Sequence, residues 1–146
     1  MNETEIFQVY MAEDDREDQQ LFKMAIDKID ASIELKLFSN GYFLLKFLEE
    51  QTRYPEVIFM DLYMSRMNGE ETLTAIRANP KYNDIPIVLF SSFYDIDYIS
   101  DLFALGANRY LHKPSSFNTL VSALKRTFDS IKRNELGGTS IINYTE

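Results

Sequence analysis

The sequence contains no cysteine among its 146 residues. A disulfide framework, a thiol nucleophile and a cysteine-bound metal are therefore excluded. Basic residues are also scarce, since 15 Lys and Arg stand against 23 Asp and Glu and give a formal net charge of −8. Such a charge suits neither a nucleic-acid backbone nor an anionic membrane, so we expect partners of neither kind.

Long hydrophobic runs are lacking as well. No uninterrupted apolar stretch approaches the roughly 20 residues that cross a bilayer. Glu3 and Glu5 stand where a secretory signal carries bases, and no apolar segment of signal type follows before Glu13. We therefore expect a cytoplasmic protein of one domain, because 146 residues leave no room for a second effector domain.

Short apolar runs alternate with segments of helical periodicity along most of the chain. Strands are predicted near residues 6–12, 33–37, 57–60, 85–90 and 108–111, and helices near 21–29, 41–49, 70–78, 97–105 and 117–133. Five such units predict a flavodoxin-like α/β fold, a doubly wound five-stranded parallel sheet with five helices. Residues 33–37 alternate between apolar and polar, which is typical of an edge strand and favours the strand order 2-1-3-4-5.

Polar side chains follow four of the predicted strands. Glu13-Asp14-Asp15 follow the first strand, Asp61 the third, Ser91-Ser92 the fourth and Lys113 the fifth. Because the carboxyl ends of parallel strands meet at one edge of a sheet, we expect these groups to share a crevice. Two carboxylates about 4 Å apart repel by about 4 kcal/mol at an effective dielectric near 20, and Mg²⁺, which prefers oxygen ligands, removes that cost. The pattern predicts a magnesium and phosphoryl site.

Asp61 stands alone at its strand end and is the best candidate nucleophile. A carboxylate is already ionised at neutral pH and attacks phosphorus without a general base. Lys113 and Ser91 are suited to neutralise the phosphoryl oxygens. Taken singly, each residue has a structural explanation: Asp15 suits a helix N-cap, Asp61 a turn, and Lys113 the surface. The prediction rests on the coincidence of the whole set.

Longer motifs surround these residues. They are Glu13-Asp14, residues 59–69, Ser91-Ser92 and residues 106–114. Together they resemble the receiver domain of bacterial response regulators in two-component systems, and in particular the stand-alone receivers paired with phytochrome-type kinases. The resemblance divides the chain into a receiver domain, residues 1–133, and a C-terminal tail, residues 134–146, which we expect to be flexible or to dock.

The resemblance implies a phosphoacceptor and a metal site. Asp61 would accept a phosphoryl group from a phosphohistidine on a sensor histidine kinase or a histidine phosphotransfer protein. Asp14 and Asp61 would bind Mg²⁺ directly, and Glu13 would bind it directly or through water. The backbone carbonyl of Tyr63 would be a further ligand. The protein would be no enzyme but a phosphoacceptor with slow, Mg-dependent self-phosphorylation and self-dephosphorylation.

The resemblance also implies a switch. Ser91 and Lys113 would contact the phosphoryl group, and Lys113-Pro114 matches the family's cis peptide bond. Ser91 would move toward the phosphate and Tyr110 would turn inward. A changed face made by the helix near 97–105, the strand 108–111 and the helix 117–133 would then bind a downstream protein, with Tyr98 and Phe103 as candidate aromatic contacts. Whether the protein forms a homodimer through this face is left open.

Two positions depart from the commoner family pattern. Ser65 stands where the family often has proline, and we expect it to contact none of the proposed ligands. Tyr63 is bulky for its place beside the expected metal site. Because the ligand there is a backbone carbonyl, metal binding should survive, whereas water access to the phosphorylated aspartate should fall. The sequence therefore predicts slow self-dephosphorylation.

Three other functions compete with this one. A phosphorelay intermediate would pass its phosphate to a histidine phosphotransfer protein, and a constitutive adaptor would work without phosphorylation. An independent phosphatase of the haloacid-dehalogenase type would need a second acid two residues after the nucleophile, where this chain has Tyr63. The lone histidine, His112, precedes Lys113 in a strand-end loop and is expected to be a solvated or packed side chain.

Overall fold

The computed structural model of the chain describes residues 6–134 and 140–142. The strands are β1 (Gln8–Ala12), β2 (Glu34–Phe38), β3 (Val57–Met60), β4 (Ile87–Ser91), β5 (Arg109–His112) and β6 (Ser140–Ile142). The helices are α1 (Arg16–Ile29), α2 (Gly41–Glu49), α3 (Gly69–Arg77), α4 (Ile96–Ala104) and α5 (Phe117–Asn134), with a 3-10 turn at Pro80–Tyr82. Within this described part, no helix has the length and apolar character needed to cross a membrane.

The strands form one parallel sheet in the order β2-β1-β3-β4-β5-β6. This arrangement confirms the predicted order of the first five strands. The five-stranded prediction missed β6, because three residues are too few to show a strand period. Residues 140–142 of the expected tail therefore pair with β5, while residues 135–139 and 143–146 lie outside the described residues.

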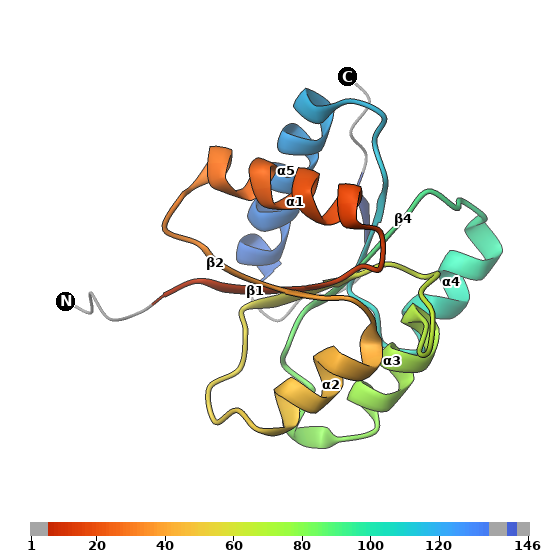
Figure 1. Cartoon of the computed structure of the whole chain (residues 1–146). Coiled ribbons are helices and arrows are strands. Elements are labelled where there is room, and N and C mark those ends of the chain that lie inside the picture. Colours follow the sequence, from red (N-terminus) through yellow and green to blue (C-terminus); the bar gives the residue numbers. More distant parts are fainter. Residues whose placement is uncertain (1–5, 135–139, 143–146) are drawn as a thin grey trace.

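Helices cover both faces of the sheet (Figure 1). Successive residues of β1 point to opposite faces, so Val9 and Met11 pack with α1 and α5, whereas Tyr10 and Ala12 pack with α2, α3 and α4. The central strands β3 and β4 are buried along their whole length. Two hydrophobic clusters result, and the sheet lies between them.

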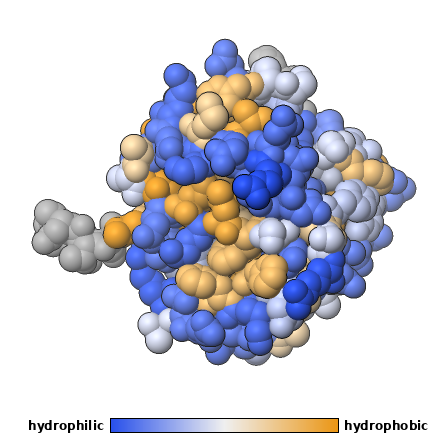
Figure 2. Space-filling model, viewed as in Figure 1, coloured by the Kyte–Doolittle hydropathy of each residue, from blue (hydrophilic) through white to orange (hydrophobic). Residues whose placement is uncertain are grey.

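The strand β2 lies at one edge of the sheet, as predicted. All five of its residues are half-buried, which fits a strand with one neighbour. Figure 2 shows hydrophobic side chains in several separate areas of this face, with hydrophilic side chains between them. The alternation of apolar and polar residues in β2 therefore correctly predicted a strand at the edge of the sheet.

Capping residues position the helices next to the strand ends. The Asp15 side chain accepts a hydrogen bond from the backbone N–H of Asp18 at 2.9 Å, and Asn40 accepts one from Phe43 at 3.1 Å. Asp15 is thus the N-cap of α1 and Asn40 that of α2. Gly106 has a φ of 116°, which lets the chain turn sharply after α4.

One glycine allows α3 to begin directly beside Asp61. The backbone N–H of Gly69 donates to the carbonyl of Leu62 at 2.9 Å. A Cβ atom on Gly69 would lie 2.4 Å from the carbonyl oxygen of Asp61 and 2.9 Å from the Cα of Leu62. These neighbours are backbone atoms, so neither can rotate away from an added methyl group.

We expect Gly69→Ala to lower the free energy of unfolding by about 1–3 kcal/mol, because the methyl group forces the β3–α3 connection apart. Chemical denaturation measures the change. Thr74→Ala, at an exposed position of the same helix, is the control and should shift stability by only about 0.5 kcal/mol. A Gly69→Ala protein as stable as the control would contradict this close approach.

Candidate functional site

The residues predicted to share a crevice lie together at the carboxyl ends of the strands. The backbone N–H of Asp61 donates to the carbonyl of Ala12 at 3.0 Å, which joins the ends of β1 and β3. The backbone N–H of Lys113 donates to the carbonyl of Ser91 at 2.8 Å, which joins the ends of β4 and β5. The Lys113 ammonium then spans the crevice and lies 3.2 Å from the Asp61 carboxylate.

Three carboxylates form an acidic cluster in this crevice. Glu13, Asp14 and Asp61 each offer an oxygen within 4.8 Å of the others. Glu13 is buried, Asp61 is 7% exposed, and Asp14 faces solvent. Oxygen ligands gathered in a partly open site suit a hard divalent cation such as Mg²⁺. The residues present therefore fit the predicted metal.

Burial and mutual repulsion make this cluster costly without a cation. Burial raises the pKa of Glu13 from 4.5 to about 7, and the negative charge of Asp61 acts in the same direction. The Lys113 ammonium, 2.9 Å away, opposes both effects but does not cancel them. Glu13 thus holds its negative charge at a cost that a bound cation would lower.

Asp18 was missed by the sequence predictions and belongs to the site. Its carboxylate lies 2.9 Å from the Lys113 ammonium, which also contacts Glu13. Although burial alone lowers the pKa of Lys113, the hydrogen bonds to Asp18 and Glu13 and the charge of Asp61 raise it above its ordinary value. An acid in the first turn of a helix is common in any protein, so Asp18 gave no distinctive signal.

Ser65 contacts a proposed ligand, contrary to the prediction. Its backbone N–H donates to the Asp14 carboxylate at 3.2 Å. A proline at this position has no N–H to donate. The departure from the family pattern therefore supplies a hydrogen bond to the acidic cluster. The backbone N–H of Tyr63 lies 3.5 Å from the Asp61 carboxylate, and the role of its carbonyl stays a prediction.

Ser91 and Tyr110 meet at the backbone of Phe93. The Ser91 hydroxyl accepts a hydrogen bond from the Phe93 N–H at 3.1 Å, and the Tyr110 hydroxyl donates to the Phe93 carbonyl. Both residues are buried, so Tyr110 already points inward in this structure. Burial raises the pKa of Tyr110 to about 12, although its hydrogen bond with Ser91 acts in the opposite direction. The proposed switch pair is thus joined through one loop residue.

Aromatic side chains continue outward from this loop. The Phe93 ring lies edge-on to Tyr63, with centroids 5.9 Å apart, and to Tyr98 on α4 at the same distance. The Tyr98 hydroxyl donates to Glu70 of α3 at 2.6 Å. Phe103 is half-buried and packs against the core, and its role as an aromatic contact stays a prediction.

Two neighbours of Lys113 are also defined. His112 places its Nε2 atom 2.9 Å from the Ser92 carbonyl, so the ring nitrogen donates there and the side chain packs against the loop. The Lys113-Pro114 peptide is trans, because no cis peptide occurs among the described residues. The cis bond implied by the resemblance is therefore wrong for this structure.

A comparison of the sequence with known families decides the class of protein. The profile of the response regulator receiver domain matches residues 9–125. The chain belongs to the response regulator receiver family. The matched region contains every residue of the acidic cluster, together with Ser91 and Lys113.

Individual receivers support this assignment. Response regulator Rcp1 of Synechocystis is 26% identical over 117 residues, a match that covers 77% of this chain and 80% of Rcp1. The phosphorylated cyanobacterial phytochrome response regulator RcpA superposes with a TM-score of 0.77 at 21% identity, over 87% of this chain and 94% of RcpA. The bacteriophytochrome response regulator RtBRR has a TM-score of 0.71 at 26% identity, over 83% and 77%. A Mn²⁺-bound form of Rcp1 also matches, with a TM-score of 0.71 at 23% identity, over 93% and 99%.

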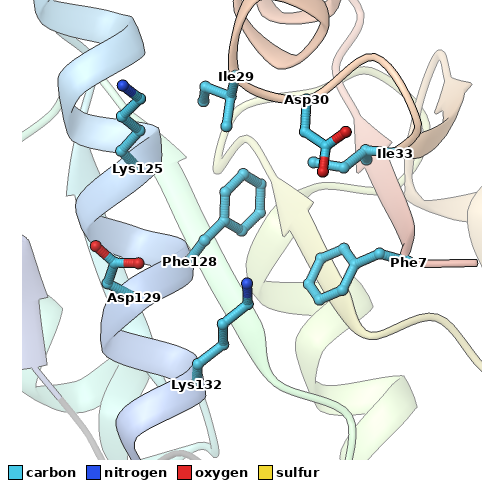
Figure 3. A pocket seen from close by; sticks show the side chains of 8 residues that line it. All are labelled: Phe7, Ile29, Asp30, Ile33, Lys125, Phe128, Asp129 and Lys132. Carbon is cyan, nitrogen blue, oxygen red and sulfur yellow. The ribbon is translucent and has the colours of Figure 1, made fainter.

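A second hollow lies away from the receiver site. It has a volume of about 300 Å³ and lies between α1, α5 and the residue before β1 (Figure 3). Phe7 and Phe128 line it with ring centroids 5.7 Å apart, and the Lys132 ammonium lies 5.6 Å from the Phe7 ring. Phe7 precedes β1 whereas Glu13 follows it, so this hollow opens at the opposite end of the strand from the acidic cluster.

The raised pKa of Glu13 predicts a pH effect on stability. Between the pKa of an unfolded Glu, 4.5, and the folded value of about 7, the folded protein binds the extra proton, so the contribution of Glu13 to stability falls as pH rises. We expect Glu13→Gln to lose less stability than the parent between about pH 5 and about pH 8 in metal-free buffer.

Denaturation midpoints measured across this pH range provide the test. Glu17→Gln, which neutralises an exposed acid on α1, is the matched control and should follow the parent curve. Parallel curves for Glu13→Gln and the parent would mean that the Glu13 carboxyl has an ordinary pKa in the folded protein.

Proposed function

We propose that this receiver accepts a phosphoryl group on Asp61 from a phosphohistidine of a sensor histidine kinase or a histidine phosphotransfer protein. One observation carries the proposal: a nearly buried carboxylate lies beside two further acids and 3.2 Å from a lysine ammonium. An aspartate that only capped a turn at a strand end would need neither the two further acids nor the lysine. The protein acts as a phosphoacceptor rather than as an enzyme of multiple turnover.

The transfer uses the side chains of the crevice. An oxygen of the Asp61 carboxylate attacks phosphorus, a new P–O bond forms, and the P–N bond of the phosphohistidine breaks with its electron pair going to the ring nitrogen. Glu13, Asp14 and Asp61 would hold Mg²⁺, which supplies charge neutralisation for the phosphoryl oxygens. Lys113 turns its ammonium toward the same oxygens.

The phosphoryl group is reported through Ser91. A new dianion on Asp61 attracts the Ser91 hydroxyl, which in this structure accepts a hydrogen bond from the Phe93 N–H. When the Ser91 hydroxyl moves to donate to a phosphoryl oxygen, it leaves the Phe93 N–H, so Phe93 keeps only the hydrogen bond that its carbonyl accepts from Tyr110. The face of α4, β5 and α5 then changes for a downstream protein.

We expect the protein incubated with Mg²⁺ and acetyl phosphate to gain one phosphoryl mass, and Asp61→Asn to gain none, because an amide cannot form the acyl phosphate. Intact mass spectrometry measures the label, which should be stable in acid and labile in base. Removing Mg²⁺ with a chelator should abolish labelling. Asp101→Asn, at an exposed site on α4, is the matched control and should label like the parent.

Other outcomes favour the competing functions. An unlabelled parent, under conditions that label another receiver, would favour a constitutive adaptor. Continuous release of phosphate at enzymatic rates would favour a phosphatase. Transfer of the label from Asp61 to a histidine phosphotransfer protein would identify a phosphorelay intermediate.

Tyr63 is expected to slow the loss of phosphate. Its side chain is 57% exposed, its ring lies edge-on to Phe93, and its backbone N–H lies 3.5 Å from the Asp61 carboxylate. Hydrolysis requires water to attack phosphorus while the Asp61 oxygen leaves with its electron pair, so a bulky ring at the opening restricts that water. Tyr63→Ala should lose phosphate about two- to tenfold faster, whereas Tyr63→Phe, which keeps the ring, should match the parent.

The decay of the phosphorylated mass after removal of acetyl phosphate measures this rate. A Tyr63→Ala decay no faster than that of the parent would show that the ring does not shield the site. Faster decay in both Tyr63→Ala and Tyr63→Phe would mean that the Tyr63 hydroxyl group, and not the ring, slows the loss of phosphate.

A further inference from the structure

Asp18 differs from the other acids around Lys113. Glu13 and Asp61 belong to the cluster that fits a metal ion, whereas Asp18 does not. A cation bound to this cluster would therefore neutralise the negative charges of Glu13 and Asp61, whereas the Asp18 carboxylate would stay paired with the Lys113 ammonium. The Asp18 carboxylate is 36% exposed and lies on the first turn of α1, where the N-cap Asp15 holds its backbone.

Asp18 also lies near the place where the phosphoryl group must sit. Asp18 and Asp61 contact the same Lys113 ammonium at 2.9 and 3.2 Å. Their contacting oxygens are therefore at most about 6 Å apart, close enough for two negative charges to repel at a protein–water boundary, where screening is weaker than in bulk water. The Asp18 carboxylate therefore also repels a negatively charged phosphoryl group as it approaches Asp61.

We propose that Asp18 competes with the phosphoryl group for Lys113 and so lowers the rate at which Asp61 is phosphorylated. This rests on the proposed function of Asp61. Asp18 acts through Lys113 and by its own charge, and it touches no reacting atom. Phosphoryl transfer requires the ammonium to turn from Asp18 to the phosphoryl oxygens, and the ion pair at 2.9 Å opposes that movement.

The test varies the charge of both the residue and the donor. Acetyl phosphate is a dianion at neutral pH, whereas phosphoramidate is a monoanion, so the repulsion by Asp18 differs between them. We expect Asp18→Asn to raise the second-order rate constant of phosphorylation by about three- to tenfold with acetyl phosphate and by about twofold or less with phosphoramidate. A merely structural role for Asp18 would change both rates alike.

Further variants separate charge from shape. Asp18→Ala should also accelerate labelling by acetyl phosphate, and Asp18→Glu should restore the slow rate of the parent. Glu17→Gln removes a charge from the same helical turn at an exposed position, and it should leave both rates near those of the parent. Thermal denaturation of each variant verifies that it is folded.

The outcomes distinguish this inference from the proposed function. A parent protein that neither donor labels would overturn both. A parent that is labelled, with Asp18→Asn and Asp18→Ala equal to it or slower, would overturn the inference alone. Slower variants would mean that Asp18 instead holds Lys113 in its working position.

Discussion

The ion pairs of Lys113 are the interaction on which the site depends. One ammonium lies within 3.2 Å of carboxylates from the ends of β1 and β3 and from the first turn of α1. Without that positive charge the buried Glu13 and the nearly buried Asp61 would repel each other in a medium that screens poorly. The lysine therefore permits the parallel sheet to bring its acids together before any metal arrives.

This balance of charge makes the site responsive to a change at Asp61. In the proposed function, a phosphoryl group would add negative charge at Asp61, which like Glu13 belongs to the acidic cluster and contacts the Lys113 ammonium. Two hydrogen bonds hold the neighbouring loop at Phe93, whose N–H donates to the site residue Ser91 and whose carbonyl accepts from the core residue Tyr110. A charge at the strand ends and a change at the surface are thus connected over a short path of named contacts.

Much of the fold was predictable from short stretches of sequence. Apolar runs predicted β1 to β5, and the alternation in β2 predicted an edge. The shared crevice of Glu13, Asp61 and Lys113 was predictable because each residue follows a strand, and the carboxyl ends of parallel strands lie together at one edge of the sheet. The sequence did not predict β6, whose three residues show no period. It also did not predict the contact of Ser65 with Asp14, because the backbone N–H of any residue except proline can make it.

The sequence by itself determined the order of elements, the edge strand and the set of acids, hydroxyl and ammonium at the strand ends. Periodicity and turn residues are local properties, so they can be read without knowing the fold. Only the tertiary structure decided which acids meet Lys113. Asp18 and Lys113 are 95 positions apart, and their contact depends on how α1 packs beside the end of β5. No local pattern distinguishes that aspartate from an ordinary acid in the first turn of a helix.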